Sequence, residues 1–526
     1  MLNTPSALNG MVTAPHHLAA QAGLRVLQDG GNAVEAMVAA AAAIAVVYPH
    51  MNAVGGDGFW LISEAGQAPV GIDAAGQSAG LATPDYYHEQ GMDGIPARGP
   101  GAALTVGGTI GGWAKALEVG QGNLPLSRLL EDAIRYAKQG IPVTQGQVDL
   151  TQEKLPELID VPGFAETYLT DGVVPATGDV LVQSSLGETL SRLAQAGLDD
   201  FYRGDVARSN ATALQRVGSP LRLTDLETYQ AQVVEPLSVQ VSTGKLYNMT
   251  PPTQGISSLM ILALFDRLKC SDAEGFDHLH GLVEATKRAF ILRNDELTDP
   301  AFMNVDVRDW LDDAFLDAEA SEIDAGKALP WPQIAKPGDT IWMGAVDKNG
   351  QAVSFIQSIY WEYGSGIVVP ETGVLWQNRG HGFTLDAGHP NVLASGKRPF
   401  HTLNPAMAIL NDGSVMTYGN MGGEGQPQTQ AAVYSRHAMF GQPLQQAVTA
   451  PRWLLGRTWG EDSTTLKLEN RFDDAVVDAL KAAGHTVDIV EPFTSIMGHA
   501  GAIVRKPNGV LMGATDPRSD GAVAAY

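Results

Sequence analysis

The segment Ala33–Val47 limits the possible folds more than any other feature of this chain. Every residue in it except Glu35 is apolar. A helix that is apolar on nearly all sides is buried on all sides, rather than lying on a surface with one face in water. Its uninterrupted apolar run, Ala36–Val47, is 12 residues long, short of the ~18–20 needed to cross a bilayer. We therefore expect this helix to be enclosed between layers of a multilayered protein.

Length and charge narrow the class further. At ~100–200 residues per domain, 526 residues predict two to four domains or one large layered fold. The net charge of −24 opposes binding to nucleic acid or to anionic lipid surfaces. A single cysteine, Cys270, excludes an internal disulfide framework and any cysteine-rich metal site.

The N-terminal residues carry no targeting signal of the usual kind. Met1–Gly10 lacks the basic and apolar regions of a secretory signal peptide. We therefore expect a cytoplasmic protein, without a membrane or nucleic-acid partner and of a size typical of enzymes.

The predicted secondary structure changes near residue 339. Before it the pattern is mainly helical, with a strand expected at Val234–Leu246. Ala328–Asp339 contains three prolines and fits no period, as expected of an exposed connector. Strand patterns then follow at Thr340–Val346 and Gln351–Tyr360, separated by Asn349-Gly350, a strong hairpin signal. Further strands are expected at Gly366–Leu375, Ala406–Leu410 and Ser414–Tyr418.

Thr340 is the sharpest candidate for a catalytic residue. It opens a strand directly after Pro337-Gly338-Asp339, and the hairpin would pair it with residues 357–359. A threonine hydroxyl becomes a useful nucleophile when the residue is N-terminal, because its own α-amino group, with a pKa of about 8, can act as the base. That chemistry requires cleavage of the Asp339–Thr340 bond. On local pattern alone, the simpler interpretation is that Thr340 is only a β-branched residue that opens a strand.

Gly422-Gly423 precedes an expected helix. Backbone N–H groups at such a turn can bind a developing oxyanion, although an ordinary tight turn has the same pattern. The glycine spacing matches neither a dinucleotide fingerprint nor a P-loop. No nucleotide cofactor is therefore expected.

Arg379 and the segment Gly396–Thr402 offer substrate-binding groups. A guanidinium just past a strand can clamp a carboxylate with two hydrogen bonds, or it can be a solvated loop arginine. His401 and Thr402 are ambiguous in the same way. The pairs His16-His17 and His278/His280 have no evident third ligand, so no metal is expected.

Taken together, these fragments resemble the γ-glutamyltransferase family of N-terminal nucleophile hydrolases over nearly the whole chain. The resemblance lies in the order and spacing of short blocks: Leu18–Val47 with Gly30-Gly31-Asn32-Ala33-Val34, Pro49-His50, Gly55-Gly56-Asp57-Gly58-Phe59, Lys397-Arg398-Pro399, Gly422-Gly423 and Asp516-Pro517-Arg518-Ser519.

The resemblance implies an α+β fold, a four-layer αββα sandwich. It implies self-cleavage between Asp339 and Thr340 into an α chain of residues 1–339 and a β chain of residues 340–526, intertwined in one fold; a pair of such αβ units is one assembly it allows. The family's second hydroxyl residue, which hydrogen-bonds the nucleophile, falls on Ser358, and its oxyanion-hole glycines fall on Gly422 and Gly423.

Several positions depart from the γ-glutamyl pattern. Tyr360 stands where those enzymes keep an asparagine, and Gly382 stands where they keep the aspartate that grips an α-amino group. His401 and Thr402 replace paired serines, Arg379 replaces a glutamine or glutamate, and no arginine matches near Ala79–Pro84. Such a pocket suits a simple anionic acyl group without an amine.

Within the family, this profile resembles the oxamate amidohydrolases of purine (urate) breakdown. The expected reaction is hydrolysis of oxamate to oxalate and ammonia through a threonyl acyl-enzyme, with Arg379, His401, Thr402 and Tyr360 around the substrate and no cofactor. A γ-glutamyl transferase or hydrolase, or a glutaryl- or cephalosporin-type acylase, is the alternative enzyme. An uncleaved, catalytically silent binding protein is the alternative of another class.

Overall fold

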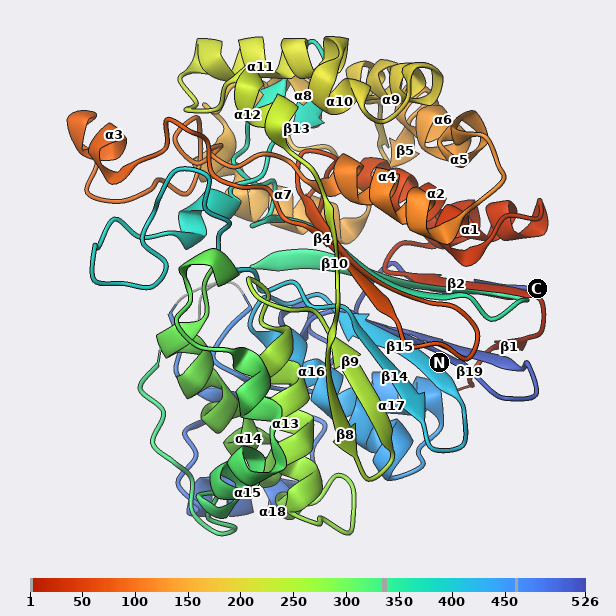
Figure 1. Ribbon diagram of the computed structural model, residues 1–526, viewed down its shortest axis with the longest axis vertical. Helices are drawn as coiled ribbons and strands as arrows, with labels where there is room; N and C mark the ends of the chain where they lie inside the picture. Colours follow the sequence, from red (N-terminus) through yellow and green to blue (C-terminus); the bar gives the residue numbers. More distant parts are fainter. Residues whose placement is uncertain (1–2, 334–337, 459–461) are drawn as a thin grey trace.

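The computed structural model describes residues 3–333, 338–458 and 462–526. Two seven-stranded sheets face each other, with helices covering the outer face of each, so four layers stack in the order helix, sheet, sheet, helix (Figure 1). The expected αββα sandwich is confirmed. Within the described ranges, no helix is both long and apolar enough to cross a membrane.

The first sheet has the strand order β21-β2-β10-β11-β3-β4-β7. Its strands are β2 Gly10–Ala14, β3 Asp57–Ser63, β4 Val70–Ala74, β7 Gln232–Val234, β10 Asp339–Asp347, β11 Ala352–Tyr360 and β21 Ala522–Ala525. Its helical layer and the adjoining helices are α1 His17–Gln28, α2 Ala33–Val47, α3 Pro84–Glu89, α4 Thr109–Gly120, α5 Leu126–Leu129, α6 Glu131–Gln139, α7 Gln145–Leu158, α8 Phe164–Tyr168, α9 Ser184–Ala196, α10 Asp200–Arg203, α11 Asp205–Val217 and α12 Leu223–Thr228.

The second sheet has the strand order β1-β20-β19-β15-β14-β9-β8. Its strands are β1 Ser6–Ala7, β8 Leu237–Val241, β9 Gly244–Asn248, β14 Ala406–Leu410, β15 Val415–Asn420, β19 Ala500–Arg505 and β20 Leu511–Thr515. The helices on its outer side and nearby are α13 Gly255–Arg267, α14 Phe276–Glu296, α15 Asp313–Ser321, α16 Gly425–Tyr434, α17 Leu444–Thr449 and α18 Asp474–Ala482. Each sheet therefore combines strands from both sides of residue 339.

Smaller strand pairs complete the fold. These are β5 Ile141–Pro142 with β6 Val180–Leu181, β12 Val368–Val369 with β13 Val374–Leu375, and the set β16 Trp453–Leu455, β17 Leu466–Glu469 and β18 Val487–Val490. The expected strand at Gly366–Leu375 is thus wrong in extent, because Gly366 and Gly373 take positive φ values of 78° and 66° and turn the chain. The strand expected at Val234–Leu246 is also wrong, because a turn divides it between β8 and β9.

Helix α2 is enclosed as its sequence requires. All of its residues are buried, and they pack on α1, on α4 and α6, and on β10 and β11. Asn32 caps its first turn by accepting from the Glu35 N–H at 2.9 Å, while the Glu35 carboxylate accepts from the Asn32 N–H at 2.8 Å. The helix gives β10 and β11 a fixed apolar backing.

The hairpin of β10 and β11 is confirmed, and its register is broken at Thr340. Ile341 lies opposite Gln357, whereas Asp339 lies opposite Tyr360, so a β-bulge falls between Asp339 and Ile341. A bulge leaves one residue outside the regular ladder and re-aims its side chain. The expected connector Ala328–Asp339 is exposed at Pro330 and Pro332, but its Gly338-Asp339 end is buried. Its residues 334–337 lie outside the described residues.

Candidate active site

Thr340 is completely buried at the start of β10. Its hydroxyl lies against the carbonyl oxygen of Asp339, the residue before it, and 3.3 Å from the hydroxyl of Ser358. The side-chain amide of Gln426, at the start of α16, lies 3.4 Å from the Thr340 oxygen. The candidate nucleophile is thus enclosed beside the peptide bond that would have to break.

Ser358 connects three parts of the site. Its hydroxyl donates to the Asp339 carbonyl oxygen at 2.6 Å. Its oxygen accepts from the backbone N–H of Tyr360 at 2.8 Å and from a guanidinium nitrogen of Arg379 at 3.4 Å. A hydroxyl donor on a carbonyl oxygen stabilises the negative charge that forms there during nucleophilic attack.

Gly422 and Gly423 form the turn between β15 and α16. Their φ values of 132° and 51° lie where a side chain is disfavoured, which explains the need for glycine. A Cβ added to Gly423 would lie 2.9 Å from the Gly338 carbonyl oxygen, so the segment before Thr340 lies directly against this turn. Gln254 holds the turn by donating to the Gly423 carbonyl at 2.9 Å.

Arg379 lies in a short 3₁₀ turn, Arg379–Gly382, and is only 1% exposed. Its guanidinium stacks over the Tyr360 ring, 4.1 Å from the ring centre. Its Nε and Nη1 atoms have no hydrogen-bond partner among the described residues. Burial lowers its pKa to about 10, so the group stays charged at neutral pH. A buried cation with free donors has the properties needed to bind an anion.

His401 is buried between Phe59 and Asp57. Its ring meets Phe59 edge-on at 5.0 Å, and its Nε2 lies 3.4 Å from a carboxylate oxygen of Asp57. Burial first, and then the nearby Arg379 and Arg398, hold the pKa of His401 well below its usual value. The imidazole is therefore neutral, and its contact with Asp57 is not an ion pair.

Thr402 lies next to the segment that precedes the candidate cleavage site. Its hydroxyl has no partner among the described residues. A Cβ added to Gly338 would lie 3.6 Å from that hydroxyl and 3.4 Å from the Tyr360 ring. The uncut chain thus fills the space beside Thr402, Tyr360 and Gly423.

The model of the family described as Gamma-glutamyltranspeptidase matches residues 19–526. The chain belongs to the γ-glutamyltranspeptidase family. It is therefore an enzyme that hydrolyses amides and is made as a self-cleaving precursor.

Two curated family members span nearly the same length. The chain is 54% identical to the oxamate amidohydrolase proenzyme of Klebsiella pneumoniae, over 98% of both chains. It is 39% identical to a glutathione hydrolase-like proenzyme of Bacillus subtilis, over 97% of both. Among solved structures, a cephalosporin acylase from Bacillus halodurans is 34% identical with a TM-score of 0.92, covering 100% of this chain and 97% of that one.

The sequence did not predict two residues of the candidate active site, Gln426 and Asp57. Gln426 reaches the Thr340 hydroxyl, and only its place three residues after Gly423 could have indicated it. Asp57 accepts from Gly76, Gly108 and Gln377 through one carboxylate oxygen. Its place in the Gly55–Phe59 block was noted, but its approach to His401 depends on folding.

The histidines of α14 have partners that the sequence did not reveal. His280, Glu284 and His485 place one donor atom each within 4.8 Å of one another. His280 and His485 hydrogen-bond each other at 2.9 Å, and Glu284 pairs with the buried Lys287 at 2.7 Å. The side chains that could bind a metal are therefore already hydrogen-bonded to each other or paired with a lysine.

A hydrolase-type serine pattern also occurs at Gly76-Gln77-Ser78-Ala79-Gly80. In such an elbow the serine stands exposed between a strand and a helix. Here Ser78 is buried in a loop, donates to the Ala394 carbonyl at 2.6 Å and accepts from the Lys397 N–H at 3.1 Å. Ser78 thus has a structural role in this enzyme.

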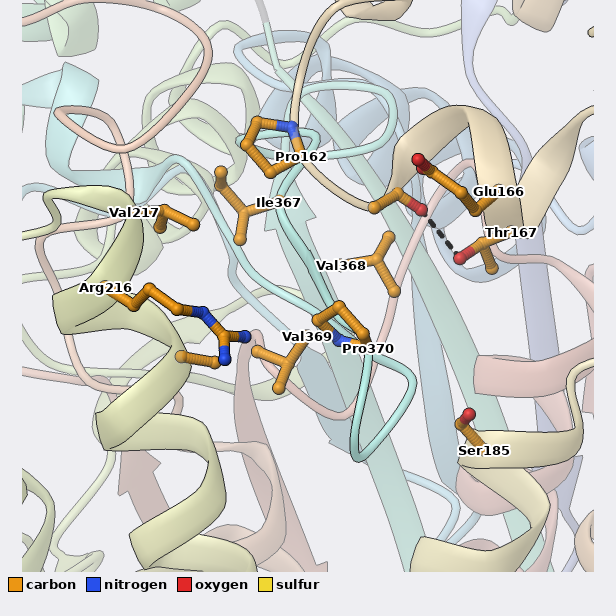
Figure 2. A pocket seen from close by; sticks show the side chains of 12 residues that line it. Pro162, Glu166, Thr167, Ser185, Arg216, Val217, Ile367, Val368, Val369 and Pro370 are labelled. Atoms are coloured by element: carbon orange, nitrogen blue, oxygen red, sulfur yellow. Dashed lines mark hydrogen bonds between the residues drawn. The ribbon is translucent and has the colours of Figure 1, made fainter.

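A pocket of about 480 Å³ opens elsewhere on the enzyme, between α8, α11 and the strand β12 (Figure 2). None of the candidate site residues lines it. Its Arg216 pairs with Glu371 at 3.0 Å, and its Thr167 donates to the Gly163 carbonyl. Two of its polar side chains, Arg216 and Thr167, therefore have partners within the protein.

Proposed function

We propose that this enzyme hydrolyses the amide of a small carboxylate, oxamate, to oxalate and ammonia, with Thr340 as the nucleophile. The observation that carries the proposal is the position of Arg379. Its guanidinium lies 3.4 Å from the Ser358 hydroxyl, and that hydroxyl lies 3.3 Å from the Thr340 oxygen.

This short separation favours a short acid. A carboxylate bound by Arg379 would have its neighbouring carbon near Thr340, as in oxamate, where the carboxylate and the amide carbon are adjacent. A glutaryl group would place several methylenes between the two. The relative from Klebsiella, which bears the name oxamate amidohydrolase, supports the same substrate.

The proposed mechanism begins with self-cleavage. The Thr340 hydroxyl attacks the Asp339 carbonyl carbon, an ester replaces the peptide bond, and water then releases the two chains, residues 1–339 and 340–526. The new α-amino group of Thr340, with an ordinary pKa of about 8, becomes the base that activates its own hydroxyl.

In the cut enzyme, the Thr340 oxygen attacks the substrate amide carbon. We assign the N–H groups of Gly422 and Gly423 to the oxyanion, where one donor commonly contributes about 3–4 kcal/mol. Ammonia leaves, and water hydrolyses the acyl-enzyme. Arg379 holds the carboxylate against the Tyr360 ring, with His401 and Thr402 limiting the size of the pocket.

Asp57 adds an acidic side chain near the pocket, but its contacts are consistent with a substrate that has no amine. One of its oxygens accepts three hydrogen bonds from the protein, and the neutral His401 stands at the other. This arrangement leaves Asp57 poorly placed to grip a substrate ammonium, so it supports an acyl group without an amine.

A glutaryl- or cephalosporin-type acylase is the second candidate, favoured by the TM-score of 0.92 to the acylase from Bacillus halodurans. The test compares ammonia release from oxamate, malonamate and glutaramate with release of the chromophore from a γ-glutamyl anilide. The proposal predicts that oxamate is hydrolysed with the highest kcat/KM. Activity confined to glutaramate or the anilide would overturn it.

The proposal extends to the role in purine (urate) breakdown and to the cytoplasmic location implied by the sequence resemblance. It makes oxamate the product of an upstream reaction and oxalate and ammonia the released products. A paired αβ assembly belongs to the same proposal, and sedimentation of the cut enzyme would test it.

A further inference from the structure

The peptide bond between Asp339 and Thr340 has a side-chain group at each of its polar atoms. Its carbonyl oxygen accepts from the Ser358 hydroxyl at 2.6 Å. Its N–H donates to a carboxyl oxygen, Oδ1, of Asp339 itself at 2.7 Å. The nitrogen that must leave during self-cleavage is therefore in direct contact with a carboxyl group.

The Asp339 carboxyl is deeply enclosed. The residue is 1% exposed, and its second oxygen, Oδ2, has no partner among the described residues. An isolated carboxylate is costly in such a place, whereas a protonated carboxyl is not. Burial first, and then the nearby Glu362 carboxylate, raise the pKa of Asp339 well above its usual range.

The cations of this region lie next to Glu362. Lys154 and Arg98 each place a nitrogen 3.9 Å from the same Glu362 oxygen, and both are also paired with more exposed acids, Glu153 and Glu157. The Thr340 N–H and, more weakly, Lys154 oppose this rise in the pKa of Asp339. A negative charge on Glu362 is therefore stabilised by two cations, whereas among the described residues Asp339 has no ion pair.

The remaining titratable neighbour adds no charge. Tyr48, the residue after α2, lies within electrostatic range of Asp520 and Asp339, and burial raises the pKa of its hydroxyl well above its usual value. The phenol is therefore neutral. Asp339, Glu362, Lys154, Arg98 and Tyr48 thus form one set of largely buried titratable groups.

Self-cleavage needs a proton at the position that Asp339 touches. When the Thr340 oxygen bonds to the Asp339 carbonyl carbon, the C–N bond breaks only if the leaving nitrogen becomes an amine. A general acid within hydrogen-bond distance typically accelerates such a step by about 10²–10⁴-fold. Oδ1 accepts the Thr340 N–H at 2.7 Å in the uncut chain, so the proton of a neutral carboxyl lies on Oδ2. Rotation of the carboxyl, as the nitrogen becomes tetrahedral, brings that O–H within hydrogen-bond distance of the nitrogen.

We propose that Asp339 is the general acid of self-cleavage and that Glu362 is a positioning residue that keeps the Asp339 carboxyl protonated. This inference rests on the self-cleavage proposed above.

The step balances with one water molecule as carrier. The Thr340 hydroxyl gives its proton to water as its oxygen bonds to the carbonyl carbon, and the Asp339 carboxyl gives its proton to the nitrogen as the C–N bond breaks. The proton on water then passes to the Asp339 carboxylate. The acid is restored, and the net change is transfer of one proton from oxygen to nitrogen.

The test follows cutting of the full chain after cell-free synthesis, by denaturing gel, in buffers from pH 5 to pH 9. In the natural chain, the rate of self-cleavage should fall as the pH rises, because Asp339 loses its proton. Asp339→Asn should cut at least 100-fold more slowly and lack that fall. Asp339→Glu, which keeps an acid, should recover at least tenfold over Asp339→Asn.

Glu362→Gln removes the negative neighbour and should move the fall in rate to lower pH by one unit or more. Its cutting should then be slow at pH 9 and within threefold of the natural chain at pH 5 to 6. Glu157→Gln, which changes the exposed carboxylate that pairs with Arg98, is the matched control and should leave the profile unmoved. A purely structural role of Glu362 would slow cutting equally at every pH.

Each result decides the inference. If Asp339→Asn cuts at the natural rate, Asp339 is not the general acid. The same conclusion follows if Asp339→Glu cuts no faster than Asp339→Asn. An unmoved pH profile in Glu362→Gln overturns the positioning role. If Thr340→Ala still cuts, the proposed nucleophile is wrong instead, so failure of this inference and failure of the proposed function give different patterns.

Discussion

The Ser358 hydroxyl donates to the Asp339 carbonyl oxygen at 2.6 Å. The β-bulge between Asp339 and Ile341 interrupts the ladder at that point, and the backbone N–H of Tyr360 holds the Ser358 oxygen from the other side at 2.8 Å. The bond that we propose is broken is therefore polarised in the folded, uncut chain.

Ser358→Ala should slow self-cleavage by about 10²–10³-fold, because it removes a donor from the oxygen on which negative charge develops. The measurement is the rate at which the full chain disappears on a denaturing gel. Ser354→Ala is the matched control: Ser354 lies on the same strand and accepts from Trp342 at 2.9 Å. Equal cutting by both variants would refute the role of Ser358.

Arg379→Met should raise KM for oxamate by about 10- to 100-fold, since hydrogen bonds to a charged group contribute ~1.5–3 kcal/mol. kcat should also fall, because the anchor and the reacting carbon are adjacent. Steady-state ammonia release measures both. Arg216→Met changes a more exposed arginine that pairs with Glu371 and should leave both constants within twofold; unchanged kinetics in Arg379→Met would remove the clamp from the mechanism.

Asp57 should make stability depend on pH. Burial raises its pKa to about 7 from an ordinary 3.8, so the folded chain binds more protons between these values and loses stability as pH rises through them. Asp57→Asn should remove this loss. The difference in free energy of unfolding between the natural chain and the variant, measured by urea titration, should therefore change steadily from pH 4 to pH 7. A constant difference would contradict the shift.

Asp516 should make stability depend on pH in the opposite direction to Asp57. Burial alone would raise its pKa, but Arg452 and Arg518 hold it to about 2, with Arg452 at 2.7 Å. This stability is present above pH 3.8 and is lost as pH falls toward 2. Asp516→Ala should cost about 3–5 kcal/mol at pH 7, because it leaves the buried Arg452 without its acidic partner, whereas Arg518 keeps its pair with Glu469. A change in Tm of less than 2 °C would contradict this.

The layered fold could be predicted because its strongest signals are local. The apolar surface of Ala33–Val47 requires burial on every side, and Asn349-Gly350 fixes the β10–β11 hairpin. Positive φ at Gly366 shortens the strand expected at Gly366–Leu375, and positive φ at Gly373 helps divide it, because such backbone angles do not show in an alternating pattern. The mixing of both halves of the chain in each sheet depends on long-range pairing that no local window contains.

The candidate site was predictable in part for the same reason. Thr340 and Gly422-Gly423 stand in recognisable contexts, and the family resemblance added Ser358. Gln426, Asp57 and Glu362 lie in ordinary contexts, and their importance comes from neighbours brought together by folding. Their burial, which gives Asp57 and Glu362 raised pKa values, is a property of the assembled layers.

The central claim is that the chain cuts itself before Thr340 and that the new amine activates the adjoining hydroxyl. End-group sequencing of active enzyme tests it most directly. The account predicts two chains that divide the 55.6 kDa in proportion to residues 1–339 and 340–526, with the smaller one beginning Thr-Ile-Trp-Met, and a single uncut, inactive chain for Thr340→Ala. Amide hydrolysis by an intact chain, or by fragments that begin elsewhere, would contradict it.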